Sequence, residues 1–245
     1  GIVVPSTPAP IQISASDLPP IETGTSTSAG FTGVKANLQL DSRKTVPALP
    51  WVAATAPLYT PDPQSYNYST ALSVYDSLGN PHALTMYFEK TATSGEWQTH
   101  FNVDGTNDTY VTVNSGNPLL FGTNGALDAT TPGSPMNITI DLDAVSTALG
   151  TTNNANPTMT FDVNFTGTTQ FGSAFGTNRL EQDGYAAGHL VGLSVGSDGV
   201  IQGRYSNGQN FAQGQIVMAN FTNPNGLQSL GSNQWIETSV SGPAL

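Results

Sequence analysis

One segment of this 245-residue chain has the spacing of a hydrolase nucleophile. Residues Gly192–Gly196 match the G-x-S-x-G pattern, in which a strand, a sharp turn and a helix expose a reactive serine. Here residues 197–199 favour a hairpin turn, and residues 200–201 are typical of a second strand. A catalytic triad would continue with an acid and then a histidine, but no histidine follows His189. We therefore interpret the pattern as a glycine-flanked strand end, and predict no catalytic residue and no enzyme.

The other side chains that could do chemistry are candidate metal ligands. They are three histidines and two acidic pairs: His82, His100 and His189, Asp104 with Asp108, and Asp141 with Asp143. The histidines fall in separate strand-like segments without the helical i, i+4 spacing that suits zinc. The acidic pairs lack the D-x-[DN]-x-[DN]-G frame of a calcium loop. We expect structural or exposed roles for the histidines and no cofactor, while a weak cation site in an acidic loop stays open.

Composition excludes several classes of partner. Only 9% of the residues are charged, against about 25% in an average domain. The net charge is −11 with six Lys and Arg, so the clustered cations that nucleic acid or anionic membranes require are missing. No apolar run approaches the roughly 18–20 residues that span a bilayer. Thr, Ser and Asn together number 73, which indicates a surface that is polar largely without ions. There is no cysteine, so disulfides and thiolate metal sites are excluded.

The spacing of turn residues predicts an all-β fold. Pro and Gly recur about every 8–12 residues, as in a β-sandwich or barrel. Residues 158–165 alternate polar and apolar side chains without a break, which is typical of a half-buried strand. The other predicted strands are Val34–Leu40, Thr70–Tyr75, Ala83–Phe88, Trp97–Val103, Thr109–Val113, Met136–Leu142, Leu190–Val195, Val200–Tyr205 and Gln215–Ala219.

Two further segments have distinct signatures. Residues 141–149 predict the one short helix, capped by Asp143, with Val145 and Leu149 on one face. Residues 44–63 contain five prolines around Trp51, which predicts an extended loop because proline cannot donate a ladder hydrogen bond.

Three blocks of sequence carry a more specific signal. Residues 65–90 read as a β-hairpin turning at 76–80. Residues 184–207 begin with Gly184-Tyr185 and end in a Y-S-N sequence. The third block, residues 211–244, contains a short apolar strand, an N-P-N-G turn, and a tryptophan in polar surroundings.

These blocks cover roughly a third of the chain and are similar, in order and spacing, to segments of bacterial flagellar hook proteins. The family shows V-[YF]-D-S-x-G-N-x-H in the first block, N-G-Y-x-x-G-x-L in the second, and G-Q-I-V-[LM]-A-N-F, N-x-x-G-L, G-x-N-x-W and S-G-x-A in the third. The positions that carry the resemblance are Tyr75, Asp76, Gly79, Asn80, Tyr87, Phe88, Gly184, Tyr185, Gly214, Gln215, Asn220, Phe221, Gly226, Leu227, Trp235 and Gly242.

The resemblance implies two β-rich domains, sandwich-like or barrel-like, one inserted into the other. Residues 1–22 with 188–245 would form the inner domain, and residues 23–187 the inserted outer domain. In the family, helical terminal segments form the innermost wall of the tube. No long heptad segment is found at either end of this chain, so we expect a partial subunit that is monomeric in dilute solution.

The function implied is a structural one. Hook subunits build a short curved tube that acts as a universal joint between motor and filament, outside the cell, after export through the flagellar secretion channel. The implied partners are other copies of the subunit, the hook cap, the rod and the hook–filament junction proteins. The alternative is an extracellular β-sandwich adhesin or carbohydrate-binding module, which would need two or three of Trp51, Trp97 and Trp235 aligned on one exposed face. Packing is the expected role of Trp97, which lies on an amphipathic strand.

Overall fold

The computed structural model describes residues 16–26, 30–54, 56–128, 134–216 and 219–244. The chain divides into two compact units. The larger unit is one continuous stretch, Pro19–Ala187, and the smaller unit combines the described residues up to Leu18 with those from Gly188 onward. The assignment of these units as outer and inner domains of an assembly stays a prediction.

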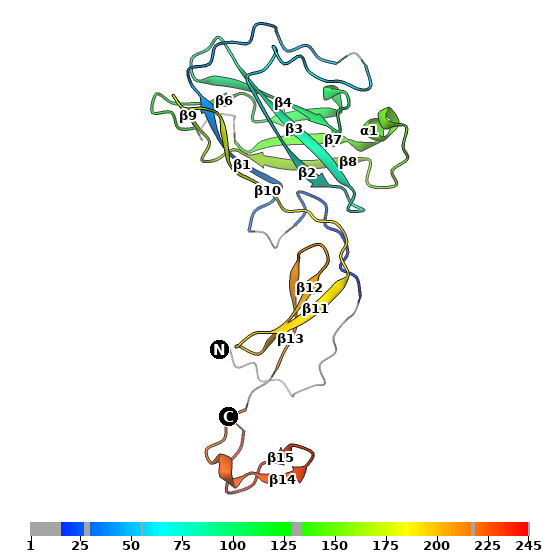
Figure 1. Ribbon diagram of the computed structural model, residues 1–245, viewed down its shortest axis with the longest axis vertical. Helices are drawn as coiled ribbons and strands as arrows, with labels where there is room; N and C mark the ends of the chain where they lie inside the picture. The colour runs from blue at the N-terminus through cyan, green and yellow to red at the C-terminus, as the bar shows by residue number, and fades with distance from the viewer. Residues whose placement is uncertain (1–15, 27–29, 55, 129–133, 217–218, 245) are drawn as a thin grey trace. The chain divides into compact units, whose positions relative to one another are not determined.

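Two sheets enclose the core of the larger unit (Figure 1). The first has the order β10-β1-β8-β7-β5, with β9 also paired to β1, and the second has the order β2-β3-β4-β6. The first is built from β1 (Val34–Asp41), β5 (Val111–Ser115), β7 (Met136–Asp141), β8 (Thr158–Asn164), β9 (Thr169–Phe171) and β10 (Gly176–Gln182). The second is built from β2 (Tyr68–Tyr75), β3 (Pro81–Lys90), β4 (Glu96–Val103) and β6 (Leu119–Leu120).

Alternation along each strand decides which side chains enter the core. In β8, Met159, Phe161 and Val163 are buried, while the residues between them face outward. Across the two sheets, the rings of Phe88 and Phe165 meet edge to face at 5.9 Å between centroids. Trp97 is fully buried, which confirms its predicted packing role. The all-β prediction is confirmed, and the sandwich owes its cohesion to this shared apolar layer.

The helix is present, but its predicted cap is wrong. Helix α1 (Leu142–Leu149) begins after Asp141, whose side chain accepts a hydrogen bond from the backbone N–H of Ala144 at 2.9 Å. A cap must stand in extended backbone before the first turn, as Asp141 does, whereas Asp143 already lies inside that turn. Leu149 is exposed, so only Val145 of the predicted apolar pair is buried.

The predicted strand Thr109–Val113 is also shifted. A short 3₁₀ turn, η1 (Asp108–Tyr110), precedes β5 because Asn107 accepts a hydrogen bond from the N–H of Thr109. Strand pairing therefore starts only at Val111.

The smaller unit contains a three-stranded sheet and a two-stranded hairpin. The sheet has the order β11-β12-β13, from β11 (Leu190–Val195), β12 (Val200–Tyr205) and β13 (Asn210–Gln215). The 3₁₀ turn η2 (Pro224–Gly226) precedes the hairpin of β14 (Gln228–Gly231) and β15 (Gln234–Ile236). Strand β13 ends at Gln215, where the strand 215–219 was predicted to begin, and residues 217–218 lie outside the described residues. The G-x-S-x-G segment is the end of β11 and its turn into β12, as predicted.

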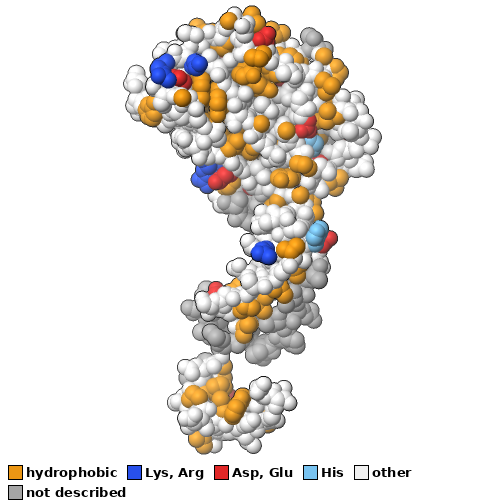
Figure 2. Space-filling model, in the orientation of Figure 1, with side chains coloured by type: hydrophobic (Ala, Val, Ile, Leu, Met, Phe, Trp, Pro, Cys, Tyr) orange, Lys and Arg blue, Asp and Glu red, His pale blue; other side chains and the backbone are white. Residues whose placement is uncertain are grey.

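On the face of the larger unit that Figure 2 shows, few side chains are charged, and apolar side chains lie scattered among uncharged polar ones. On the outward face of β5, β7 and β8, short side chains bond across strands. Asn114 donates to Asn137 Oδ1 and to Thr139 Oγ1, each at 2.8 Å, and the hydroxyls of Thr139 and Thr160 are 2.8 Å apart. We call Asn114, Asn137, Thr139, Thr160 and Asp162 the polar ladder. No helix among the described residues has the length and apolar character that crossing a membrane requires.

Candidate functional site

Six of the predicted motif positions meet where the chain enters and leaves the larger unit. These positions are Tyr75, Asp76, Gly79, Asn80, Gly184 and Tyr185. The backbones of Ile21 and Tyr185 exchange two hydrogen bonds, at 3.0 and 2.9 Å, and the N–H of Thr23 donates to the carbonyl of Tyr75 at 2.9 Å. Segments far apart in the sequence are thus tied together at one end of the unit.

Two glycines are required there by close approach. Gly79 has a φ of 82°, and a Cβ at this position would lie 2.6 Å from the Cβ of Pro20 and 3.1 Å from the Cα of Ala186. A Cβ on Gly184 would lie 2.6 Å from Thr23 Oγ1. Any larger residue at either position would push the entering and leaving segments apart.

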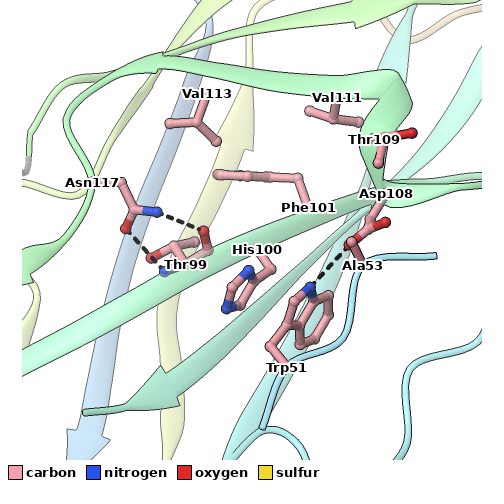
Figure 3. A pocket seen from close by; sticks show the side chains of 10 residues that line it. All are labelled: Trp51, Ala53, Thr99, His100, Phe101, Asp108, Thr109, Val111, Val113 and Asn117. Carbon is pink, nitrogen blue, oxygen red and sulfur yellow. Dashed lines mark hydrogen bonds between the residues drawn. The ribbon is translucent and has the colours of Figure 1, made fainter. Parts of the chain in front are cut away.

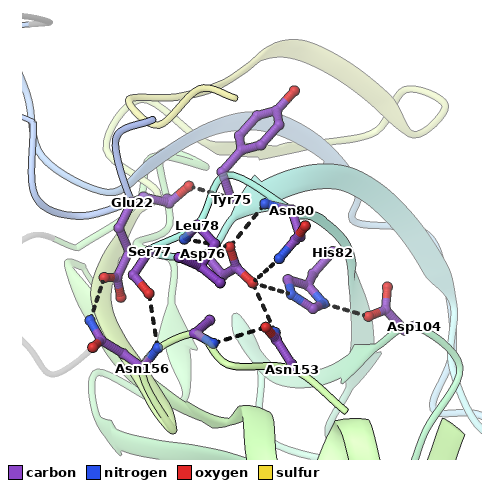
Figure 4. A network of polar contacts seen from close by, with 12 residues as sticks. Glu22, Tyr75, Asp76, Ser77, Leu78, Asn80, His82, Asp104, Asn153 and Asn156 are labelled. Atoms are coloured by element: carbon purple, nitrogen blue, oxygen red, sulfur yellow. Dashed lines mark hydrogen bonds and ion pairs between the residues drawn. The ribbon is translucent and has the colours of Figure 1, made fainter. Parts of the chain in front are cut away.

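Asp76 is the centre of a polar network at this end (Figure 4). It is fully buried, and its Oδ1 accepts hydrogen bonds from the backbone N–H groups of Leu78 and Asn80, each at 2.9 Å. Its Oδ2 accepts from the side-chain amides of Asn80 and Asn153, also at 2.9 Å each. Burial acts to raise the pKa of Asp76, but these hydrogen bonds outweigh it, so the pKa lies below its ordinary value.

His82 lies between two carboxylates in the same network. Its Nδ1 is 2.7 Å from Asp104 Oδ2, and its Nε2 is 3.5 Å from Asp76 Oδ2. The other oxygen of Asp104 accepts from the N–H of Ala83 at 2.7 Å. Hydrogen bonding to Asp104 raises the pKa of His82, burial opposes the rise, and the contact with Asp76 adds to it.

The network extends to the segment that enters the unit. The N–H of Asn156 donates to Ser77 Oγ at 2.8 Å, and its side-chain amide donates to Glu22 Oε2 at 3.1 Å. Burial raises the pKa of Glu22, the bond from Asn156 lowers it, and the negative charge of Asp76 raises it further. We call Glu22, Asp76, Asn80, His82, Asp104, Asn153 and Asn156 the junction network.

A second polar and aromatic cluster lies on the outward face of β3 and β4. Trp51, from the proline-rich segment, stacks on His100 with centroids 4.0 Å apart and ring planes 4° apart. Its indole N–H donates to Asp108 Oδ2 at 2.9 Å, which ties the loop to η1 (Figure 3). Tyr87 adds a ring contact at 5.3 Å. As predicted, no strand forms in the described part of residues 44–63, and Trp51 explains how the loop is held.

Beside this cluster is a cavity of about 280 Å³, lined by Trp51, Ala53, Thr99, His100, Phe101, Asp108, Thr109, Val111, Val113 and Asn117. The side chain of Asn117 takes the place of a neighbouring strand at Thr99, because it accepts from the backbone N–H and donates to the carbonyl, each at 3.1 Å. Burial lowers the pKa of His100, and the bond to Glu89 Oε2 at 2.9 Å offsets this only in part.

The remaining motif positions are placed separately. Phe88 points into the core, next to outward-facing Tyr87 on β3. Those in the smaller unit are Gly214 and Gln215 on β13, Asn220 and Phe221 after it, Gly226 and Leu227 at η2, Trp235 on β15, and Gly242 beyond it. Trp235 is 62% exposed, and a Cβ on Gly226 would lie 2.6 Å from the N atom of Ser241.

Among the described residues, neither cluster gathers the ligands of a metal site. Within the described ranges, no group of three His, Asp or Glu side chains could hold a metal ion. The partners Asn153 and Asn156 were not predicted, because no local pattern marks them, and Asp104 was considered only in the acidic pair with Asp108. What both clusters do is fix loops to strands.

Known proteins share sequence similarity with this chain. Residues 39–185 match the family described as the flagellar basal body protein FlaE D2 domain. The chain is 34% identical over 248 residues to the flagellar hook protein FlgE of Salmonella typhimurium, covering all of this chain and 56% of that protein. It is 32% identical over 188 residues to FlgE of Helicobacter pylori, covering 73% of this chain and 25% of the relative. The chain thus spans about half, or less, of the length of these relatives.

The fold has a solved counterpart. The crystal structure of Helicobacter pylori flagellar hook protein FlgE2 superposes with a TM-score of 0.50 at 18% identity, over 73% of this chain and 38% of that one. By its sequence relatives and its matched domain, the chain belongs to the flagellar hook protein family, with the FlaE D2 domain at residues 39–185.

Proposed function

We propose that this chain is the folded outer part of a flagellar hook subunit, without catalytic activity, whose copies assemble into the curved tube that joins motor and filament. The tube lies outside the cell, and the subunit reaches it through the flagellar secretion channel. The cap, rod and junction proteins of the hook are its further partners. The family match over residues 39–185 supports this proposal most directly.

The polar ladder suits the mechanical task of such a subunit. As a curved tube rotates, neighbouring subunits must pass between compressed and extended spacings, so their outer contacts must slide with little change in free energy. A large apolar interface would hold one register. Hydroxyl and amide groups exchange partners with each other and with water, and each bond has a net value of about 1 kcal/mol.

Isosteric substitutions in the full-length subunit test this idea. Thr139→Val with Thr160→Val removes the paired hydroxyls and places an apolar patch between β7 and β8. We expect stiffer hooks, measured as reduced bending of isolated hooks under the light microscope. Thr99→Val is the matched control, because Thr99 is 1% exposed and its hydroxyl has no partner among the described residues. Unchanged bending in the double variant would contradict the sliding contact.

A cross-link gives an independent test. Since these 245 residues contain no cysteine, a Thr160→Cys substitution adds the one thiol among them, on the polar ladder. A cleavable bis-maleimide that links these thiols between neighbouring subunits of assembled hooks should stop bending, and cleavage of its spacer should restore bending. Bending that continues in fully cross-linked hooks would contradict the proposal.

The carbohydrate-binding alternative receives no support from the tryptophans. Trp97 is fully buried and Trp51 is stacked on His100, so these two do not form an exposed platform. Micromolar glycan binding that is lost in Trp51→Ala would favour that alternative instead.

A further inference from the structure

The hydrogen bonding of His82 specifies its protonation state. A neutral imidazole has one N–H and can donate to one acceptor, whereas an imidazolium has two. Here both ring nitrogens face carboxylate oxygens, Asp104 Oδ2 at 2.7 Å and Asp76 Oδ2 at 3.5 Å. Only the imidazolium can donate a hydrogen bond to both carboxylates at once.

The charged side chains around His82 are all acidic. Asp76 comes from the β2–β3 turn and Asp104 from the turn after β4, and Glu22 acts on Asp76 from the entering segment. On its remaining side, His82 shares a cavity of about 220 Å³ with the last turns of α1, through Val145, Ser146 and Leu149, and with Asn153. The C-terminal end of a helix carries partial negative charge, which also favours a cation. Among the described residues, no Lys or Arg forms an ion pair with this network.

His82 connects parts of both sheets. Asp76 holds the β2–β3 turn and, through Asn153, the loop between α1 and β8, while Asp104 follows β4. The same β2–β3 turn packs Gly79 against Pro20 and Ala186. Loosening this turn therefore loosens the place where the chain enters and leaves the larger unit.

We propose that His82 is a proton-operated latch, which in its imidazolium form bridges Asp76 and Asp104 and holds the junction closed, and which releases the junction when the proton is lost. The latch does not depend on the proposed assembly function, because every contact in it lies within one copy of the larger unit. Its action is to make the stability and the local opening of this end depend on pH.

The direction in which the pKa of His82 is shifted sets both the pH range over which the stability changes and whether it rises or falls. The pKa of His82 is raised above its ordinary value of about 6.5. The stabilisation is therefore complete below about pH 6.5 and is lost as the pH rises through the folded-state value. Between these two values the folded state binds one more proton than the unfolded state, so the unfolding equilibrium constant rises up to about tenfold per pH unit.

The test is urea unfolding of the 245-residue chain at intervals from pH 6 to pH 9. We expect the unfolding equilibrium constant of the wild type to rise with pH above pH 6.5, and that of His82→Gln to stay constant there. His100→Gln is the matched control, since His100 is also held by a carboxylate on the same sheet, and it should keep the rise. A wild-type profile that is flat above pH 6.5, or a rise that persists in His82→Gln, would overturn the latch.

A second pair of measurements tests the proposal in the wild-type protein alone, without the His82→Gln variant. NMR titration of the wild-type imidazole should place the pKa of His82 above 6.5. Hydrogen exchange of the Asn80 and Ala83 amides, corrected for intrinsic rates, should speed up across that pKa, because these amides bond to Asp76 and Asp104. A His82 pKa at or below 6.5, or protection that is constant across it, would refute the proposal even if His82→Gln fails to fold.

Discussion

Two histidines on adjacent strands of one sheet respond to their surroundings in opposite directions. The side chain of His82 is 10% exposed and that of His100 is 22% exposed, so both imidazoles are largely withdrawn from water. Yet the pKa of His82 is raised and that of His100 is lowered. His82 faces two carboxylates, whereas His100 has one carboxylate and an indole plate. The difference teaches that the pKa of a buried imidazole depends on whether its carboxylate partners outweigh burial: at His82 they do, and at His100 burial is the larger effect.

The largest expected effect comes from removing the shared carboxylate on the His82 side. Asp76→Asn replaces an acceptor oxygen with an NH₂ group that must face existing donors, so buried groups lose their partners. We expect the free energy of unfolding in urea at pH 6 to fall by about 3 kcal/mol. Asp143→Asn, in the exposed first turn of α1, should change it by less than about 0.5 kcal/mol. A loss below about 1 kcal/mol in Asp76→Asn would show that the network is not a stabilising unit.

The next effect concerns the indole ring of Trp51, which is stacked on His100. Trp51→Ala removes a stacked ring and the bond to Asp108, which together correspond to about 2 kcal/mol of unfolding free energy. Water then reaches the imidazole, so its pKa, followed by NMR, should move up toward the ordinary value. Trp235→Ala, at a 62% exposed position, should leave both quantities unchanged. A fall in the His100 pKa would mean that stacking, and not burial, controls it.

A matched pair of carboxylate variants sharpens the comparison further. Asp104→Asn and Glu89→Gln each remove the carboxylate hydrogen-bonded to one histidine, at 2.7 and 2.9 Å. Each should lower the pKa of its own histidine, as measured by NMR titration, and leave that of the other histidine unchanged. Cross-effects of equal size would show that the two sites are coupled through the sheet.

The smallest effect is expected in the unfolding equilibrium constant below pH 6.5. Because the pKa of His100 is lowered, its contribution is present above about pH 6.5 and is lost as the pH falls through the folded-state value. The unfolding equilibrium constant of the wild type should therefore rise on acidification below pH 6.5, by less than about tenfold, and His100→Gln should remove this part. If the rise survives in His100→Gln, the carboxylates and not this imidazole are responsible.

The sequence was sufficient for the all-β fold class but not for the order of the strands or the partners of the two histidines. Alternation along residues 158–165 and the turn at 76–80 indicated strands and a hairpin, because both signals depend on neighbours in the chain. Asn153 reaches Asp76 across 77 positions, and Trp51 reaches His100 from a proline-rich loop. Such contacts depend on how the two sheets pack, which no local spacing encodes. The helix cap was misplaced for a smaller reason, since two aspartates two positions apart compete for one role.

The backbone pairing of Ile21 with Tyr185 has a mechanical consequence. A pull applied through the two flanking segments should load the hydrogen bonds of Leu18 with Gly188 and those of Ile21 with Tyr185 in turn, because an antiparallel pair that is pulled from one end unzips rather than shears. While they hold, the sandwich beyond them lies outside the path of the load. Because the entry and the exit of the larger unit are paired side by side, an insertion within that unit should leave the spacing of the two flanking segments unchanged.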